Sequence, residues 1–309
     1  MSPASPARVG YLGPPGSFAH EAVGRLPGEH LAAASVAAAL AAVRAGDVDA
    51  ALVPFENSIE GSVAGTLDEL GDLSAPPLHI AAEILLQVHF SLLGRPGAAL
   101  AAVRTVATHP HAEAQCRAWL AGHLPGADLI LAASTSTAAR DVAAGRYDAA
   151  VGSPAASDVY GLDVLHPDVA DSPGAVTRFV LVRQPGPPPD PSGADRTTLV
   201  LYERDDHPGV LLEMLTEFAV RGVNLTRLES RPTGAGLGRY CFSLDCDGHV
   251  ADARVGEALV ALRRICAEVR FCGSYPKADG ARAFVRPGVA DADFAAAQTW
   301  LAALRTLGR

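Results

Sequence analysis

Residues 184–196 read QPGPPPDPSGADR, and this stretch separates two regions of the chain that have different residue patterns. Its five prolines disfavour a helix or a central strand, because proline fixes φ and lacks an amide proton, and proline-rich stretches act as stiff spacers. We interpret residues 184–196 as an interdomain linker. The prediction is a first domain over residues 1–183, a second over 197–276, and a tail with a short helix over 277–309.

Before the linker, short apolar runs alternate with helical patterns. Val9–Leu12 and Ala50–Pro54 predict strands, and Ser35 is placed to cap a helix that ends at Gly46. Further strands are expected at residues 105–108, 129–131, 149–151 and 179–182, with helices from about Pro110 and Ser136. This alternation predicts an α/β domain with mostly parallel sheets, whose ligands bind at the strand ends.

After the linker the order of elements changes. Strands are expected at residues 197–202, 225–231, 240–245 and 269–275, and amphipathic helices at 209–221 and 250–268. This βαββαβ order is typical of a ferredoxin-like sandwich. The glycine-rich string Gly234–Gly238 lies between two of the strands, and we interpret it as a hairpin turn.

The composition is that of a globular protein without a nucleic-acid partner. Of 309 residues, 49% are hydrophobic and 19% charged, and the net charge is −9, whereas nucleic-acid binding needs a clustered basic surface. The five cysteines form no CxxC pair, so we expect free thiols and no metal site. Neither a secretory signal nor a membrane span is visible, and we expect a cytoplasmic protein that does not bind membranes.

Three polar segments lie where an α/β domain places its sites. In the loop Gly13–Phe18, Ser17 is placed to cap the following helix, and the free N–H groups there favour an anion. The second segment, residues 53–63, places Glu56, Asn57 and Ser58 just after a strand. Capping alone explains the first segment, and an Asn-Ser turn explains the second equally well.

The third polar segment, residues 171–179, leads into the last strand before the linker. Arg178 offers a planar fork that matches a carboxylate, and Thr177 adds a hydroxyl beside it. An ordinary strand edge is the alternative reading of this Thr-Arg-Phe sequence.

In order and spacing, these segments resemble the motifs of the prephenate dehydratase family: GPxGTF, VPxENSxxGxVxxTLD and TRF. Here they read GPPGSF (13–18), VPFENSIEGSVAGTLD (53–68) and TRF (177–179). Between them, THPHAEAQC (108–116) and STSTAA (134–139) are similar to SHPQALAQC and STAxAA of the family. After the linker, HPGVL and NLTRLESRP resemble the phenylalanine-binding motifs of the family's ACT domain, a small regulatory module. The resemblance covers roughly residues 8–276.

The chain departs from the family pattern at two positions. Ala175 stands two residues before Thr177, where asparagine is usual, and Ser17 replaces a threonine but keeps the hydroxyl.

The resemblance implies a two-lobed catalytic domain of the periplasmic-binding-protein type, followed by a ferredoxin-like ACT domain. It implies a carbon–oxygen lyase that converts prephenate to phenylpyruvate in phenylalanine biosynthesis, without cofactor or metal. Thr177 would assist departure of the hydroxyl, and Arg178 would hold the substrate carboxylates. The other substrate-binding residues that it implies are Ser17, Asn57, Ser58, Thr135 and Phe179.

The resemblance also implies allosteric inhibition by L-phenylalanine, bound where two ACT domains meet side by side. The chain would then form a homo-oligomer, a dimer or a tetramer. The implied effector residues are His207, Pro208, Gly209, Val210, Leu211, Asn224, Glu229, Ser230, Arg231 and Pro232. Two alternatives stay open at this point: an arogenate dehydratase, which performs the same chemistry on the aminated substrate, and a catalytically silent sensor of two ligand-binding domains.

Overall fold

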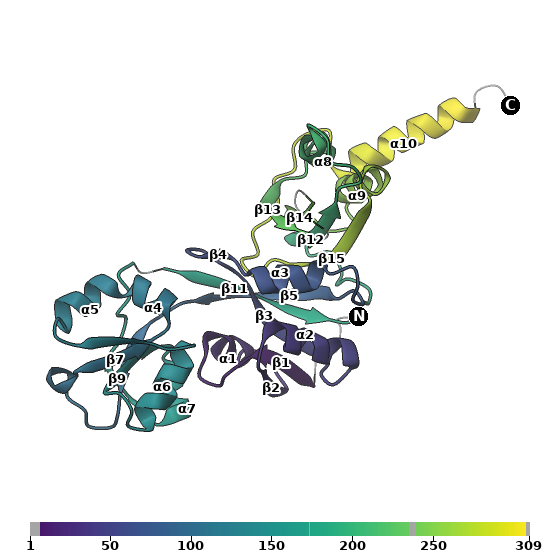
Figure 1. Ribbon diagram of the computed structural model, residues 1–309. Helices are drawn as coiled ribbons and strands as arrows, with labels where there is room; N and C mark the ends of the chain where they lie inside the picture. Colours follow the sequence, from purple (N-terminus) through teal and green to yellow (C-terminus); the bar gives the residue numbers. More distant parts are fainter. Residues whose placement is uncertain (1–6, 173, 235, 237–238, 307–309) are drawn as a thin grey trace. The chain divides into compact units, whose positions relative to one another are not determined.

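The computed structural model describes residues 7–172, 174–234, 236 and 239–306 (Figure 1). Pro173 of the third polar segment and three residues of the predicted glycine-rich turn (Ala235, Leu237 and Gly238) lie outside the described residues. The chain forms two compact units. One contains the described residues up to Thr66 together with Ile84–Val182, and the other contains Leu67–Glu83 together with the described residues from Arg183 onward.

The first lobe of the N-terminal unit is built on a sheet with the strand order β2-β1-β3-β11-β5, and β4 pairs with β3. The central strand β1 is parallel to both neighbours, with Tyr11 opposite Ala32 on one side and Leu52 on the other. Its strands are β1 (Arg8–Leu12), β2 (Glu29–Ala33), β3 (Ala50–Asn57), β4 (Gly61–Ser62), β5 (His79–Gln87) and β11 (Val176–Arg183). The accompanying helices are α1 (Phe18–Val23), α2 (Val36–Ala45) and α3 (Ala64–Gly71), and α3 passes into the C-terminal unit at Leu67.

The second lobe has a mixed sheet with the strand order β10-β6-β9-β7-β8. Strand β7 is parallel to β8 and β9, whereas β6 is antiparallel to β9 and β10. The strands are β6 (Ser91–Gly94), β7 (Thr105–Thr108), β8 (Asp128–Leu131), β9 (Ala149–Gly152) and β10 (Asp163–His166). The helical segments are a 3₁₀ turn (Leu100–Ala102), α4 (Pro110–Gln115), α5 (Arg117–His123), α6 (Thr135–Ala143) and α7 (Ala155–Tyr160).

Two apolar clusters hold the second lobe together. Leu92 and Val106 pack with Cys116 and Leu120 of the α4–α5 region, and Leu93 and Ala107 belong to a separate cluster with residues of α6 and α7. Alternate residues of a strand point to opposite faces, so this division places helices on both faces of the sheet. The predicted α/β class is confirmed, with more antiparallel pairing than the sequence indicated.

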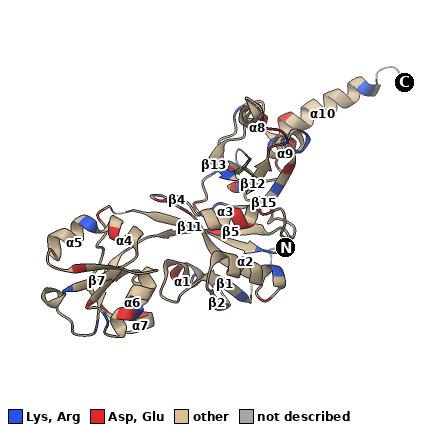
Figure 2. Cartoon of the chain, viewed as in Figure 1, with Lys and Arg blue, Asp and Glu red and all other residues tan. Residues whose placement is uncertain are grey.

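The C-terminal unit contains the predicted βαββαβ order, folded into an antiparallel sheet with the strand order β13-β14-β12-β15. Leu199 and Leu244 of the sheet pack against Phe218 of α8 and Leu262 of α9. The strands are β12 (Asp195–Tyr202), β13 (Leu225–Pro232), β14 (Tyr240–Asp247) and β15 (Glu268–Pro276). The helices are α8 (Val210–Ala219), α9 (Ala253–Ile265) and α10 (Asp291–Thr306). In Figure 2, α10 is uncharged between an acidic start and a basic end.

Leu67–Glu83 packs with this C-terminal unit although it lies far away in the sequence. The Tyr202 hydroxyl donates to the carbonyl oxygen of Gly71, and Arg270 donates to the carbonyl oxygens of Asp72 and Ala75, at 2.9 Å each. Gly273 has φ +132°, and a Cβ there would lie 2.3 Å from the carbonyl oxygen of Ile80, so only glycine permits this approach.

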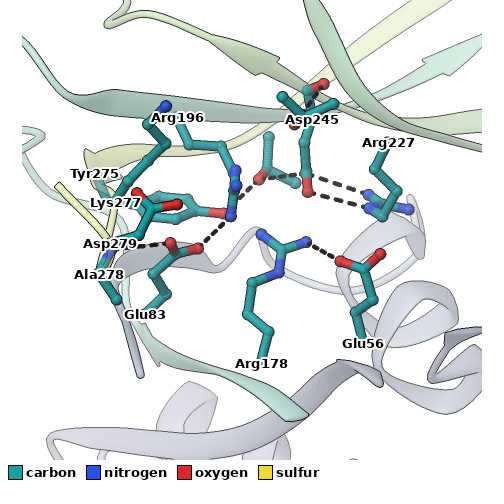
Figure 3. A network of polar contacts seen from close by, with 12 residues as sticks. Glu56, Glu83, Arg178, Arg196, Arg227, Asp245, Tyr275, Lys277, Ala278 and Asp279 are labelled. Atoms are coloured by element: carbon teal, nitrogen blue, oxygen red, sulfur yellow. Dashed lines mark hydrogen bonds and ion pairs between the residues drawn. The ribbon is translucent and has the colours of Figure 1, made fainter. Parts of the chain in front are cut away.

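The C-terminal unit also buries a network of charged side chains, drawn in Figure 3. Arg196 bonds to Glu83 at 2.5 Å, and Arg227 bonds to Asp245 at 3.1 Å. Thr198 also donates to Asp245, at 2.8 Å. Buried charges are tolerated when they are paired and hydrogen-bonded, as these are.

Two further expectations concern thiols and membranes. Each of the five cysteines, all within the described residues, is buried and free, as the absence of CxxC pairs predicted. Among the described residues, no helix is long and apolar enough to cross a bilayer.

Candidate active site

A cavity of about 720 Å³ lies in the N-terminal unit, and residues from both lobes line it. The first lobe contributes the β1–α1 loop, the segment after β3 and the start of β11. The second lobe contributes the β7–α4 region and the start of α6. The lining residues used below are Ser17, Phe18, Asn57, Glu60, Ala64, Val88, Phe90, His109, His111, Gln115, Ser134, Thr135, Thr177 and Phe179.

At the cavity wall, the Nδ2 atom of Asn57 donates a hydrogen bond of 2.8 Å to Oγ1 of Thr177. The Oδ1 atom of Asn57 accepts from the backbone N–H groups of Ile59 and Glu60, at 2.9 and 3.1 Å. These two bonds fix which end of the amide faces the threonine. Because the Thr177 oxygen accepts from Asn57, its own proton is left to be donated elsewhere.

Ser58 bonds to the backbone of β11, the strand that carries Thr177, and does not line the cavity. Its Oγ accepts from the N–H of Val176 at 3.0 Å, and its own N–H donates to the carbonyl oxygen of Val176 at 2.9 Å. This pair of bonds attaches the loop after β3 to the residue just before Thr177. The geometry favours a positioning role for Ser58, in place of the direct substrate contact that the sequence predicted.

Arg178 lies on the opposite face of β11 from the cavity. Successive side chains of a strand alternate between faces, and Thr177 and Phe179 line the cavity whereas Arg178 does not. Its Nη2 atom lies 3.1 Å from Oε2 of Glu56 (Figure 3). Its guanidinium lies over the ring of Phe55, 4.6 Å from the ring centroid. The Arg178 side chain is 6% exposed. The observed contacts therefore hold the strand, and they do not present the guanidinium to a ligand in the cavity.

Ser17 fulfils the capping role and also lines the cavity. Its Oγ accepts from the N–H of His20 at 3.2 Å, as an N-cap residue of α1, and donates to the carbonyl oxygen of Leu12. Across the cleft, the Tyr160 hydroxyl donates to the carbonyl oxygen of Pro15 at 2.8 Å, and Ser136 donates to the same oxygen. The β1–α1 loop, which contributes Ser17 to the cavity, is thus tied to the second lobe.

The N-terminus of α6 meets the cavity at Ser134 and Thr135. Ser134 is the N-cap residue, and its Oγ accepts from the N–H of Thr137 at 3.0 Å. The first turn of a helix exposes unpaired N–H groups and the positive end of the helix dipole. Thr135, a predicted substrate-binding residue, therefore lies where an anionic group is favoured.

A polar cluster of Glu60, His111 and Gln115, none of them among the expected site residues, crosses the cavity. The Nε2 atom of Gln115 donates to Oε1 of Glu60 at 3.2 Å, and Nδ1 of His111 lies 3.9 Å from the second oxygen of Glu60. Burial lowers the pKa of His109, the proximity of His111 lowers it further, and Glu60 opposes these effects only in part. Gln115 and His111 belong to the motif THPHAEAQC (108–116), which could have indicated them. Glu60 stands at a variable position of the motif at residues 53–68, so no sequence signal marked it.

Apolar side chains form the remaining wall. Phe18 and Phe90 meet edge to face with ring centroids 5.3 Å apart, and Val88 and Phe179 lie beside them in the lining. Phe179 is a predicted site residue that the structure brings to the cavity. Nothing in the local pattern around Val88 and Phe90 distinguishes them from ordinary strand residues.

Ala175, the departure from the family pattern, is buried in the apolar cluster of the second lobe that contains Val88 and Phe90. Its carbonyl oxygen accepts from the N–H of Val88 at 2.7 Å. The hydrogen bond to Thr177 comes from Asn57, so the alanine leaves the threonine with a partner.

The predicted effector residues lie at three places in the C-terminal unit: around the start of α8, just before β13 and at the end of β13. His207–Leu211 lead into α8, where Gly209 is the N-cap residue with φ +98°. His207, two residues before Gly209, bonds to Glu213, and this bond raises the pKa of the imidazole. The residues Glu229, Ser230, Arg231 and Pro232 end β13, which is an edge strand of its sheet.

Asn224 precedes β13, and its orientation is fixed by a carboxylate. Its Nδ2 atom donates to Asp247 at 2.9 Å, and Asp247 also bonds to Lys277 at 3.0 Å. The amide oxygen of Asn224 therefore points away from Asp247, and it is the end that accepts a hydrogen bond from an ammonium group.

Within the described residues, no group of three or more His, Cys, Asp or Glu side chains is arranged to hold a metal ion.

The fold and site define a two-lobed α/β domain with a cavity lined by both lobes, followed in the chain by a ferredoxin-like βαββαβ domain. Residues 9–187 match the family described as prephenate dehydratase, and residues 198–264 match the ACT domain. The chain belongs to the prephenate dehydratase family.

Individual relatives agree with this assignment over nearly the whole chain. A prephenate dehydratase of Mycolicibacterium vanbaalenii is 52% identical, with 88% of this chain and 91% of that protein covered. One from Amycolatopsis methanolica is 48% identical, with 97% and 98% covered. The solved structure of prephenate dehydratase from Arthrobacter aurescens, in complex with L-Phe, is 45% identical with a TM-score of 0.91, and 96% of this chain and 99% of that chain are covered.

Proposed function

We propose that the chain converts prephenate to phenylpyruvate, with the Thr177 hydroxyl as the donor to the departing hydroxyl group. The observation that carries the proposal is the bond from Asn57 to Thr177 at the wall of the cavity. Membership of the family supports the reaction, and the geometry supports the role of the threonine.

The difficult step of the reaction is departure of the ring hydroxyl, and a hydrogen-bond or proton donor assists it. The bond between the ring and its carboxylate breaks and its electron pair enters the ring. The bond to the ring hydroxyl breaks at the opposite carbon, and that pair leaves on oxygen. The products are carbon dioxide and an aromatic ring. The leaving oxygen takes a proton and departs as water. Hydroxide is a poor leaving group, and a positioned donor contributes ~10²–10⁴-fold to such a step.

Thr177 is suited to this step by its surroundings. It is 9% exposed, and its oxygen accepts from Asn57, so its proton is directed away from the amide. A threonine hydroxyl is a weak acid, and we propose that it hydrogen-bonds to the leaving oxygen and relays a proton. A donor that is fixed in a water-poor site needs little reorganisation when charge develops.

The substrate carboxylates need a positive partner that Arg178 is not placed to supply. We propose that the first turn of α6, at Ser134 and Thr135, takes one carboxylate, and that the ring lies against Phe18, Phe90 and Phe179. Arg178 then acts as a positioning residue that holds β11 through Glu56 and Phe55.

We further propose that L-phenylalanine inhibits the enzyme by binding at the C-terminal unit, in an oligomer formed through this unit. The solved relative with L-Phe supports the choice of effector. The N–H groups before α8 suit the carboxylate of the amino acid, and the Asn224 oxygen suits its ammonium group. Within the described residues, β13 is an edge strand of its sheet, and edge strands are a common place for two chains to associate.

The function is tested by incubating the purified full-length protein with prephenate or arogenate in the presence of a chelator. We expect phenylpyruvate from prephenate at an undiminished rate, and at most slow formation of phenylalanine from arogenate. Faster turnover of arogenate would reassign the substrate, and unchanged prephenate would favour a silent sensor.

A further inference from the structure

Two sequence motifs of different domains meet in one ion pair, between Asp68 and Arg231. The Nε and Nη2 atoms of Arg231 donate to the two carboxylate oxygens of Asp68, at 3.0 and 2.9 Å. Asp68 ends the TLD part of the motif at residues 53–68, and Arg231 belongs to the ESRP part of the motif at 224–232. The bidentate geometry fixes the guanidinium plane and is the strong form of such a pair.

Asp68 lies on α3, a helix in which the chain passes from one compact unit to the other. Ala64, at the start of α3, lines the active-site cavity, and the residues from Leu67 belong to the C-terminal unit. A helix rises 1.5 Å per residue, so Asp68 lies only ~6 Å along the axis from Ala64. The start of α3 is itself fixed by Thr66, whose hydroxyl donates to the carbonyl oxygen of Pro54 at 2.6 Å.

Arg231 lies on β13, among the residues that the family resemblance implies for phenylalanine binding. Its side chain is 24% exposed, and the bond to Asp68 is the largest influence that raises the pKa of its guanidinium. Glu229 lies 3.8 Å from the same guanidinium and so competes with Asp68 for it. A ligand that shifts β13 would therefore change how strongly Arg231 bonds to Asp68 relative to Glu229.

We propose that the Arg231–Asp68 pair couples phenylalanine binding to the cavity through α3, with Asp68 as a positioning residue that takes no part in either site. This inference rests on the proposed regulation and deepens it. An effector inhibits an enzyme only if it binds two arrangements of the protein with unequal affinity. Helix α3 starts at the cavity wall and carries Asp68, so ligands at either site can change its position and thereby affect the other site.

The test compares full-length wild-type protein with Asp68→Asn, which removes the charge and keeps the shape. The matched control is Asp128→Asn, which removes one exposed carboxylate from the start of β8. Turnover of prephenate is followed against L-phenylalanine, and L-phenylalanine binding is measured by calorimetry with and without phenylpyruvate. Asp68→Glu, which restores a carboxylate, is measured alongside.

We expect Asp68→Asn to bind phenylalanine within about threefold of wild type and to be inhibited at least fivefold less, while Asp128→Asn behaves as wild type. Asp68→Glu should regain part of the inhibition. Coupling is reciprocal, so phenylpyruvate should change the phenylalanine affinity of the wild type and not that of Asp68→Asn.

Two outcomes would overturn the coupling role alone. One is an Asp68→Asn variant that phenylalanine inhibits as strongly as wild type. The other is an Asp68→Asn variant that no longer binds phenylalanine, which would make Asp68 itself part of the effector site. A wild-type protein that turns over prephenate but ignores phenylalanine would overturn the proposed regulation and this inference together.

Discussion

The Asn57 amide and the Thr177 hydroxyl, 120 residues apart in the sequence, are joined by a hydrogen bond of 2.8 Å in which Asn57 is the donor. The direction of this bond is set by the loop after β3, because two backbone N–H groups occupy the other end of the amide. The loop thus determines which way the threonine proton is directed.

Replacing Asn57 with aspartate tests that direction. A carboxylate keeps the acceptor for the N–H groups of Ile59 and Glu60 but cannot donate, so the Thr177 proton should turn toward it and away from the substrate. We expect kcat to fall ~10²-fold, the scale of a lost donor, with an unchanged melting temperature. Activity within threefold of wild type would show that the orientation of Thr177 is unimportant.

Arg178→Lys distinguishes a structural role of this arginine in holding β11 from a role in binding the substrate carboxylates. Because the side chain contacts Glu56 and Phe55 behind β11, we expect a lower melting temperature and a lower kcat, with KM for prephenate changed less than threefold. Glu56→Gln is the matched variant and should behave alike. A tenfold rise in KM at unchanged stability would restore the substrate-binding role that the sequence indicated.

The buried thiols predict how stability changes at high pH. Burial raises the pKa of Cys116 and of Cys272 from 9.0 to about 12, and that of Cys266 to about 11. Because these folded-state values exceed the unfolded ones, the stabilisation is complete below pH 9 and is lost as the pH rises from there toward 11–12.

Urea unfolding midpoints between pH 8 and 11 measure this loss, and Cys116→Ala should make the decrease shallower. At pH 8 without urea, a thiol reagent should label none of the five cysteines within minutes. Rapid labelling of the native protein would contradict the burial on which the prediction rests.

Asn224→Ala tests the effector site. Loss of the oxygen that we assign to the ammonium group of phenylalanine should raise the concentration for half-maximal inhibition about tenfold, which corresponds to ~1.4 kcal/mol. Inhibition curves and calorimetry on the full-length protein measure the effect, with Thr299→Ala on α10 as a control. Unchanged phenylalanine affinity would exclude Asn224 from the site.

The full-length protein is required for that test. A chain truncated near Gln184 would isolate the catalytic domain only if residues 1–183 folded without the C-terminal unit. Leu67–Glu83, however, packs with the C-terminal unit through Tyr202, Arg270 and Gly273, so truncation would remove the partners of this segment. We therefore expect the truncated chain to be unstable.

Local signals were sufficient to predict much of the fold. Ser35 and Gly46 cap α2 as predicted, with Gly46 at φ +80°, and the βαββαβ order follows from periodicity alone. Strand β2 was missed because EHLAA shows no alternation. The packing of Leu67–Glu83 with distant strands depends on non-local contacts that periodicity does not encode.

The site was predicted unevenly for a similar reason. The motifs located Asn57, Thr177 and Phe179, which the structure brings to one cavity. Arg178 follows Thr177 directly, and the period of two along a strand already indicates that both cannot face the same cavity. Glu60 and Gln115 come from different lobes, so their contact became visible only in the folded chain.

The most direct test of the account is phenylpyruvate formation from prephenate by wild-type protein and by Thr177→Val, each with chelator present. The substitution removes the hydroxyl and leaves a side chain of the same shape in β11. We predict turnover by the wild type and a kcat at least ~10²-fold lower for the variant, with an unchanged circular dichroism spectrum and melting temperature. A kcat of Thr177→Val within a few-fold of wild type would contradict the role of Thr177. A wild-type protein that leaves prephenate unchanged would contradict the proposed reaction.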